Sequence, residues 1–338
     1  MADDILAAAR PVFLHGAWRS GSTYYWSRFR EVPTTLCFYE PLHHGLAKLT
    51  QERIARGGGD AMAALSHPAL SAPYFAEYAP LIRSRGVHGY RSSLAYEHYH
   101  LEPDEPHPAL HSYIDGLLGH AKRAGKRAVL GFNRSCGRVA WLKRRFGAFD
   151  IHIDREPVAI WASYAAERAR GNNAFFSMWL RVLEANQEDP LWAPLADRLK
   201  PRGTIARRLT KMGPDHRRRI ADMDETQGYL LVFYAWLATA PASMAACDLV
   251  IDDGLAHLPH YARRLEAQVE AGVGLTLDLS GAVVRPARAI LDEGVRRRVE
   301  AEALALFPSR AGRRRTGPTG AWTSQLCARK LELIAAVS

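Results

Sequence analysis

The residues best suited to chemistry in this sequence of 338 residues form a glycine-rich turn near its start. A short apolar run over 12–15 leads into Gly16, and Gly21 follows after four further residues. A buried strand, a glycine turn and the first turn of a helix together point several backbone N–H groups at one place. The spacing therefore predicts a loop that binds an anion over residues 16–23.

The cation beside this loop indicates which kind of anion is bound. In kinases and ATPases, the second glycine of such a loop is followed by a lysine that reaches the terminal phosphates. Ser22 occupies this position here, and the nearest cation is Arg19. The loop thus favours a nucleotide whose phosphates are held and not cleaved. A P-loop kinase or another nucleotide-dependent phosphotransferase is the alternative, although no clear pair of magnesium-binding aspartates accompanies the loop.

A second anion site is predicted where a later strand ends. The apolar run over 149–153 is followed by Arg155, and Pro157 fits the first turn of a helix. Ser163 lies eight residues after Arg155, on the same helix. An arginine at a strand end and a serine on the next helix can bind one phosphate, the arginine through forked charge-assisted hydrogen bonds. We therefore expect Arg155 and Ser163 to act together.

These segments resemble the sulfotransferases that use 3′-phosphoadenosine 5′-phosphosulfate. Residues 19–24, Arg-Ser-Gly-Ser-Thr-Tyr, are similar to the phosphosulfate-binding loop of that family, Lys/Arg-Ser-Gly-Thr-Thr followed by an aromatic residue. The spacing of Arg155, Pro157 and Ser163 resembles the family's 3′-phosphate site, with Glu156 where the family usually has Asp or Asn.

A third segment near the C-terminus adds to the resemblance. Residues 315–322, Arg-Thr-Gly-Pro-Thr-Gly-Ala-Trp, resemble the family's Arg-Lys-Gly-x-x-Gly-x-Trp loop, with Thr316 in place of lysine. That loop closes over the donor and contacts its 3′-phosphate. Taken without the resemblance, Arg315 and the two arginines before it read equally well as a solvated basic tail.

The resemblance implies the donor, its binding residues and the absence of a metal. Tyr24 would stack on the adenine ring, although it also fits a core position on a helix. Arg19 would contact the phosphate oxygen that leaves the sulfur and would thus be catalytic as well as donor-binding. The donor-binding residues that the resemblance implies are Arg19, Ser20, Gly21, Ser22, Thr23, Tyr24, Arg155, Ser163, Arg315 and Gly317.

The reaction also needs a base for the acceptor proton. The cytosolic branch of the family uses a histidine at a strand end, but the corresponding strand over 129–134 contains none. Other branches use a glutamate at the end of the second strand, and Glu40 matches that placement. Because parallel strands present their carboxyl ends to one crevice, Glu40 and Arg19 should face the same cleft. His43 and His44 are the alternative bases.

The net charge and the number of cysteines indicate which kinds of ligand and which cellular compartment suit this protein. The net charge of +10 favours anionic ligands, while 48% hydrophobic and 24% charged residues are ordinary for a globular protein. A nucleic-acid-binding protein would show a basic stripe interleaved with aromatic residues and not a glycine loop. Four well-separated cysteines argue against a disulfide framework or a zinc site. No secretory signal is visible, so we expect a cytoplasmic enzyme. Because the basic stripe with aromatic residues is missing, we also expect that it binds no nucleic acid.

The hydrophobic pattern predicts one α/β domain over 1–338. Strands alternate with helices, which indicates a parallel sheet covered on both faces, a three-layer αβα arrangement. The resemblance implies the P-loop-like sulfotransferase fold. The predicted strands are 11–15, 36–39, 128–133, 149–153 and 248–251, and the predicted helices are 22–31, 136–146, 157–170, 176–187, 227–246 and 257–272.

Three regions have no assigned chemistry. The uncharged run 226–247 predicts a buried core helix and no membrane span, because its densest apolar part is shorter than the roughly 20 residues a span requires. Residues 45–127 read as a helical insertion packed over one edge of the sheet. The basic segment 198–219 fits a solvated helix face or a substrate lid.

Tyrosines of the insertion could pack it or line an acceptor site, and they are Tyr74, Tyr78, Tyr90, Tyr96 and Tyr99, with His98 beside them. The resemblance implies a glycan or a small hydroxylated molecule as the acceptor, and the oligomeric state stays open.

Overall fold

The computed structural model describes residues 10–57, 70, 72–84, 86–171, 176–199, 220–283 and 291–308. The predicted loop over 315–322, with Arg315 and Gly317, lies outside these residues. So does most of the basic segment, from residue 200 to residue 219.

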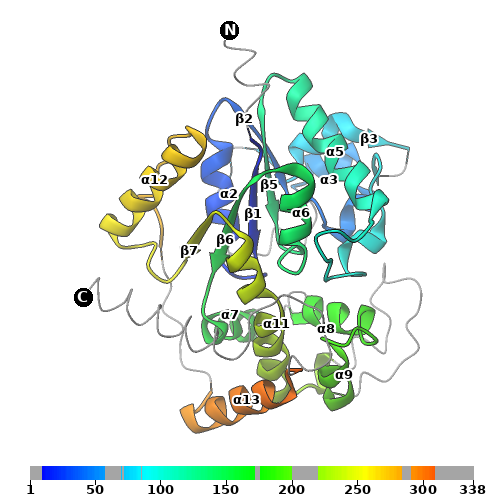
Figure 1. Ribbon diagram of the computed structural model, residues 1–338, viewed down its shortest axis with the longest axis vertical. Helices are drawn as coiled ribbons and strands as arrows, with labels where there is room; N and C mark the ends of the chain where they lie inside the picture. Colours follow the sequence, from blue (N-terminus) through cyan, green and yellow to red (C-terminus); the bar gives the residue numbers. More distant parts are fainter. Residues whose placement is uncertain are drawn as a thin grey trace.

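A sheet of five parallel strands forms the centre of the molecule, in the order β2-β5-β1-β6-β7 (Figure 1). The strands are β1 (Val12–Gly16), β2 (Thr35–Tyr39), β5 (Arg127–Phe132), β6 (Phe149–Asp154) and β7 (Leu249–Asp252). All neighbouring strands in this sheet pair in parallel, so their carboxyl ends share one edge. The five predicted strands and the parallel α/β sheet are confirmed.

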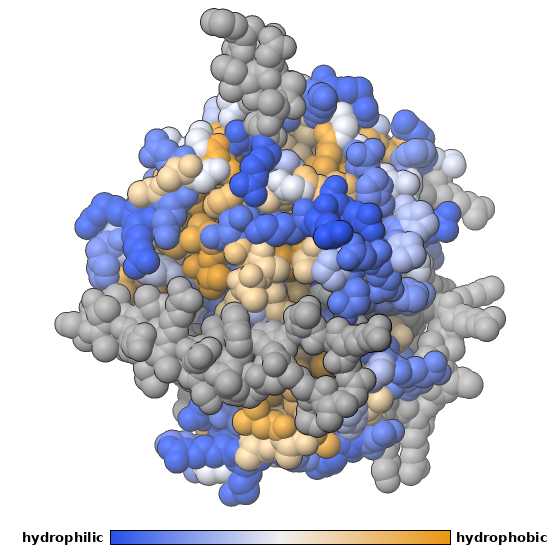
Figure 2. All heavy atoms as spheres, viewed as in Figure 1, coloured by the Kyte–Doolittle hydropathy of each residue, from blue (hydrophilic) through white to orange (hydrophobic). Residues whose placement is uncertain are grey.

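Helices cover both faces of this sheet. Figure 1 shows α2 (Ser22–Arg30) and α12 (Pro259–Val273) on one side, and α5 (Pro108–Arg123) and α6 (Val139–Phe146) on the other. Helix α2 approaches closely because β5 has a glycine below it. A Cβ atom on Gly131 would lie 2.7 Å from Trp26 Cδ1. Figure 2 shows hydrophilic side chains over the outer surfaces of α12 and α5, with apolar side chains in the strip between them.

A second group of helices lies beyond the carboxyl ends of the strands (Figure 1). It consists of α7 (Pro157–Ala169), α8 (Phe176–Ala185), α9 (Ala193–Leu199), α11 (Glu225–Ala246) and α13 (Glu293–Leu306). Buried side chains that include Trp161, Trp179, Trp192 and Tyr229 form its core. Helices α9 and α13 were not predicted, although Asp292 caps α13 by accepting hydrogen bonds from Gly294 N and Val295 N.

Helix α11 behaves as the core helix that the sequence predicts. Of the described helices, it alone is long and apolar enough to cross a membrane by length and composition. However, 67% of its most apolar stretch is buried inside the protein. It packs against α6, α7, α8 and α13, so its apolar surface is used within the chain.

The region between β2 and β5 is built mainly from short elements and one long helix. The short elements are η1 (His44–Lys48), α3 (Gln51–Ala55), η2 (Ala76–Leu81), β3 (Ile82–Arg83), β4 (Gly86–Val87) and η3 (Ser92–Ala95). They lie on the β2 side of the sheet, where η2 contacts β2 and α5 contacts β5. Helix α5 is a regular helix of 16 residues, longer than the helical pieces expected here.

Candidate anion-binding and catalytic site

The predicted anion-binding loop lies at the carboxyl end of the central strand β1. It runs from Gly16 to Ser22, the first residue of α2, and Gly21 before it is left-handed with φ of 85°. Neither glycine has room for a side chain. A Cβ atom on Gly16 would lie 2.5 Å from Ser20 Oγ, and one on Gly21 would lie 2.3 Å from Asp253 Oδ1. The loop therefore requires both glycines to close this tightly.

Ser20 places a hydrogen-bonding group inside the loop. The residue is 1% exposed, and its Oγ is buried without a hydrogen-bond partner among the described residues. Leaving a buried hydroxyl unpaired costs about 1–3 kcal/mol. A ligand oxygen bound in the loop would remove this cost.

Arg19 lies against helix α7. Its Nε donates a hydrogen bond to Ser163 Oγ at 2.8 Å, and its Nη2 is 3.5 Å from Glu167 Oε1. Burial lowers the pKa of Arg19, and the Glu167 carboxylate partly opposes this shift. The backbone of Arg19 is left-handed with φ of 70°, a conformation that a non-glycine residue rarely adopts. Glu167, which the sequence did not single out, thus helps to orient the cation of the loop.

Arg155 contacts the same loop from the end of β6. Its Nη1 donates to the carbonyl oxygen of Arg19 at 2.9 Å, and its Nε lies 3.7 Å from Asp253 Oδ2. Arg155 and Ser163 each contact Arg19, one through the backbone and the other through the side chain. Three residues predicted from two separate segments, Arg19 from one and Arg155 with Ser163 from the other, therefore lie together at the carboxyl edge of the sheet.

Asp253 adds a carboxylate that the sequence reasoning missed. It directly follows β7, and its Oδ1 accepts a hydrogen bond from Tyr25 Oη at 3.4 Å. Burial raises the pKa of Asp253 to about 6, while the nearby Arg155 acts in the opposite direction. Its carboxylate lies where a side chain on Gly21 would be. A protein carboxylate thus lies against the loop that is predicted to bind an anion.

Glu40 lies one residue beyond β2 and is buried. Its Oε1 accepts a hydrogen bond from Asn133 Nδ2 at 2.8 Å, and its Oε2 accepts one from Arg134 Nη1. Asn133 in turn accepts a hydrogen bond from Ser22 Oγ at 2.8 Å. Burial alone would lower the pKa of Arg134, but the Glu40 carboxylate raises it above its ordinary value. A hydrogen-bond chain therefore connects Glu40 to the first residue of α2.

The backbone around Glu40 is held by the inserted region. Glu40 is left-handed with φ of 40°, and its N–H donates to Gly131 O at 2.8 Å. Buried tyrosine hydroxyls donate to the neighbouring carbonyl oxygens, Tyr78 to Tyr39 at 3.1 Å, Tyr113 to Pro41 at 2.8 Å and Tyr90 to Leu42 at 3.2 Å. Tyr78 and Tyr90 of the insertion thus pack and position this segment.

The two alternative bases, His43 and His44, lie nearby, and Nδ1 of each ring makes a hydrogen bond. The rings of His43 and His44 stack at 4.6 Å. His43 Nδ1 accepts a hydrogen bond from Gly45 N, and His44 Nδ1 shares one with Tyr96 Oη at 3.1 Å. Burial and nearby positive groups lower the pKa of His43 well below its ordinary value and that of His44 to about 2. Both imidazoles are therefore weak bases.

The two remaining predicted donor-binding residues of this segment, Thr23 and Tyr24, lie in the first turn of α2. Thr23 Oγ1 and Tyr39 Oη share a hydrogen bond of 3.1 Å. The hydroxyl of Tyr24 donates to Leu279 O at 3.0 Å, and the Arg28 guanidinium lies 5.4 Å from the centroid of its half-buried ring. Adenine stacking on Tyr24 stays a prediction.

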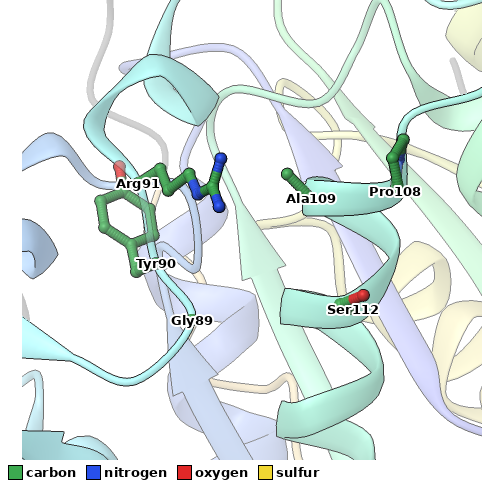
Figure 3. Close-up of a pocket in the computed structure, with 6 residues that line it drawn as sticks. All are labelled: Gly89, Tyr90, Arg91, Pro108, Ala109 and Ser112. Carbon is green, nitrogen blue, oxygen red and sulfur yellow. The ribbon is translucent and has the colours of Figure 1, made fainter.

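A surface hollow of about 460 Å³ lies between residues 89–91 and the first turns of α5. Figure 3 shows its lining residues, which are Gly89, Tyr90, Arg91, Pro108, Ala109 and Ser112. None of them belongs to the loop, but Tyr90 connects the hollow to the Glu40 segment through its bond to Leu42. Within the described ranges, no group of three or more His, Cys, Asp or Glu residues is placed to hold a metal ion.

A second polar chain, not predicted from the sequence, lies inside the sheet. His15 Nδ1 is 2.7 Å from Ser135 Oγ, and His15 Nε2 is 2.9 Å from Asp150 Oδ1. All three residues are fully buried. Because no substrate can reach them in this structure, we interpret them as a packing network.

No protein-family model, curated protein or solved structure matches this chain. Its function is therefore inferred from the residues and geometry of the site.

Proposed function

We propose that this protein is a sulfotransferase that moves a sulfuryl group from 3′-phosphoadenosine 5′-phosphosulfate to a hydroxyl or amine of a glycan or small molecule. One observation carries the proposal. Arg155 and Ser163, from a strand end and the following helix, both contact Arg19 in a glycine loop that has no lysine after Gly21. Two guanidinium groups and a serine hydroxyl lie next to the N-terminus of α2. Together with the backbone N–H groups of that helix end, they suit a ligand with several anionic groups.

The loop residues fit such a donor. Ser20 Oγ is a buried hydroxyl without a partner in the described structure, and glycines at positions 16 and 21 allow a ligand to approach the backbone closely. Asp253 opposes an anion at the same place, so its carboxylate has to move or take up a proton when the donor binds. The fit therefore includes a specific local rearrangement at Asp253.

The transfer is an in-line displacement at sulfur. The acceptor oxygen forms a bond to sulfur as the bond between sulfur and the bridging phosphate oxygen breaks, and that electron pair leaves with adenosine 3′,5′-bisphosphate. The acceptor proton passes to the base. Arg19 would donate hydrogen bonds to the phosphate oxygen that gains charge, the electrostatic role that lowers such barriers most.

Glu40 would accept the acceptor proton. Each of its carboxylate oxygens accepts one hydrogen bond, from Asn133 or Arg134, and each keeps a further lone pair that can take a proton. The chain through Asn133 to Ser22 fixes Glu40 relative to the donor loop. Proton transfer and donor binding would thus be coupled through three side chains.

Ligand-dependent thermal stability tests the proposal. We expect adenosine 3′,5′-bisphosphate to stabilise the protein by about 2.7 kcal/mol at 100 times its Kd, and ATP with magnesium or a DNA oligonucleotide to have little effect. Stabilisation by ATP with magnesium alone would instead favour a phosphotransferase. A screen of hydroxylated acceptors with a sulfate-labelled donor then tests the transfer itself, and no labelled product with any acceptor class would count against it.

A further inference from the structure

Two buried arginines lie against one tyrosine beside Glu40. Arg134 is 1% exposed and follows β5, and Arg181 is 5% exposed and belongs to α8. The guanidinium carbon of each lies 5.6 Å from the centroid of the Tyr96 ring. Arg134 also lies 5.0 Å from the ring of Trp18 in the donor loop. We call Arg134, Arg181 and Tyr96 the two-arginine cluster.

The charges of this cluster do not balance. Arg134 pairs with Glu40. Among the residues that the structure describes, Arg181 has no carboxylate within ion-pair distance, and its hydrogen bond runs from Nη1 to Tyr96 Oη at 3.3 Å. Burial and the two nearby arginines lower the pKa of His43 and His44, so both imidazoles are neutral. One positive charge is thus buried without a counterion, which is costly unless an anion binds there.

The orientation of Arg181 indicates the shape of that anion. Its Nη1 is used by Tyr96, which leaves the edge formed by Nε and Nη2. Two parallel N–H groups on this edge match two oxygens of a carboxylate or of a sulfate or phosphate ester. Neither nitrogen donates a hydrogen bond to a described residue, and neither is fully buried, so a ligand can reach this edge.

We propose that Arg181 binds an anionic group on the acceptor, so that the substrate is a hydroxylated molecule that carries a carboxylate, sulfate or phosphate. The word acceptor rests on the proposed transferase function, whereas the anion site does not. Arg134 lies between the two ends of such a molecule, because it contacts Glu40 directly and shares the Tyr96 ring with Arg181. The anionic end is held at Arg181, and the hydroxyl is presented to Glu40.

Four aromatic probes test the anion site without any need for turnover. Benzoate, phenyl sulfate and phenyl phosphate each carry one of the three oxyanions on the same phenyl ring. Benzamide is the neutral compound of similar size. We expect at least one oxyanion to bind saturably, measured by melting temperature and tryptophan fluorescence of the full chain. Benzamide should bind at least about 30-fold more weakly, as expected when a buried charge pair is lost. The strongest oxyanion identifies the group that the acceptor carries.

Variants of Arg181 attribute the binding to this residue. Arg181→Gln should weaken the preferred oxyanion by about 30-fold or more, and Arg181→Lys, which keeps the charge without the fork, should lie in between. The exposed Arg123 provides the control, and Arg123→Gln should bind as wild type does. If Arg181→Gln does not fold, the lysine variant alone decides.

The outcomes separate this inference from the proposed function. Equal binding of oxyanions and benzamide, or equal oxyanion binding by wild type and the Arg181 variants, would overturn the anion site. Failure of adenosine 3′,5′-bisphosphate to bind, with the oxyanion result intact, would overturn the transferase and leave the anion site standing.

Discussion

The three consecutive residues 133–135 belong to two different hydrogen-bond chains, one at the end of the sheet and one buried inside it. Asn133 and Arg134 bind Glu40, which lies just beyond the end of β2, whereas Ser135 joins His15 and Asp150 inside the sheet. The first chain reaches the glycine loop through Ser22, and the second has no exposed surface.

The second chain shows that residue types alone do not make a site. A serine, a histidine and an aspartate in a hydrogen-bonded row suggest a hydrolase triad, but the order is reversed. In a triad, serine bonds Nε2 and aspartate bonds Nδ1, whereas Ser135 bonds Nδ1 of His15 and Asp150 bonds Nε2. Asp150 is the second residue of its strand. Access and position at the strand ends, and not composition, distinguish the chain that contains Glu40.

The strongest test of this contrast is Glu40→Gln. The amide keeps the size of the side chain and removes the charge that accepts the proton, so turnover should fall by about 10²–10⁴-fold. Affinity for adenosine 3′,5′-bisphosphate should change little. Steady-state kinetics and titration calorimetry measure the two effects.

Glu77→Gln is the matched control for this change. Glu77 is a largely buried carboxylate, 11% exposed, that pairs with Arg30 at 2.7 Å but lies outside the site. Both variants leave an arginine without its anionic partner and should lower the melting temperature. Only Glu40→Gln should lose turnover, and a similar loss of turnover in both variants would make Glu40 structural.

Arg155→Ala should produce the next largest effect. Removal of one partner from a hydrogen-bonded charge pair should weaken donor binding by about 2–5 kcal/mol. Wild type should bind adenosine 3′,5′-bisphosphate much more tightly than adenosine 5′-phosphate, and the variant should bind the two about equally. Titration calorimetry measures all four affinities, with the exposed Arg144→Ala as control. A wild type that does not distinguish the two nucleotides would remove Arg155 from the 3′-phosphate site.

Ser135→Ala tests the buried chain of Ser135, His15 and Asp150, for which we expect a loss of stability without a loss of activity. The change leaves His15 Nδ1 unpaired in a fully buried position, so the free energy of unfolding should fall by about 1–3 kcal/mol. Turnover and nucleotide affinity of the folded protein should stay as in wild type. Denaturant titration and kinetics check both expectations, and a variant of full stability with little activity would place the chain in the site after all.

Asp253→Asn should have the smallest effect, and it depends on pH. The pKa of Asp253 is raised to about 6 from an ordinary value of 3.8, so the carboxylate becomes neutral as the pH falls through about 6. Inorganic sulfate keeps its charge over this range and should bind wild type a few-fold more tightly at pH 5 than at pH 8. The variant should bind it tightly at both pH values, and a pH dependence that survives the substitution would exclude Asp253 as its source.

The same shift predicts how stability depends on pH. Because the folded state holds the proton of Asp253 more tightly than the unfolded state, the contribution of this group to stability falls as the pH rises from about 4 to about 6. Asp253→Asn should flatten this part of the stability profile, measured by thermal unfolding across the window.

The sequence predicted the strands and the loop, because each depends on short-range signals, whereas the meeting of Arg19 with Arg155 and Ser163 followed only from the resemblance, which assigns all three to one donor. A buried apolar run, a glycine turn and a proline at the start of a helix all act within a few residues. The neighbours of Glu40 did not follow from such signals. Asn133 and Arg134 reach Glu40 only because β5 lies next to β2, and the order of strands in the sheet is a long-range property.

Glu167 and Asp253 were missed for a related reason. Each is one of many carboxylates in the sequence, and only the packing of α7 and β7 around the loop places them beside Arg19 and Gly21. Prolines at positions 103, 106 and 108 concealed a regular helix, which begins with Pro108 and is capped by His107. Helix α13 had a recognisable start in Asp292 and an i,i+4 ion pair from Glu293 to Arg297.

The left-handed backbone at Arg19 and Glu40 restricts which residues can replace them. For most L-amino acids this conformation costs about 1–2 kcal/mol, whereas glycine tolerates it freely and asparagine and aspartate tolerate it better than most. A saturation scan at either position should therefore reject valine and isoleucine on conformational grounds alone, whatever their chemistry. The set of residues open to evolution at positions 19 and 40 is narrowed first by the shape of the chain, and catalysis selects only among those that are left.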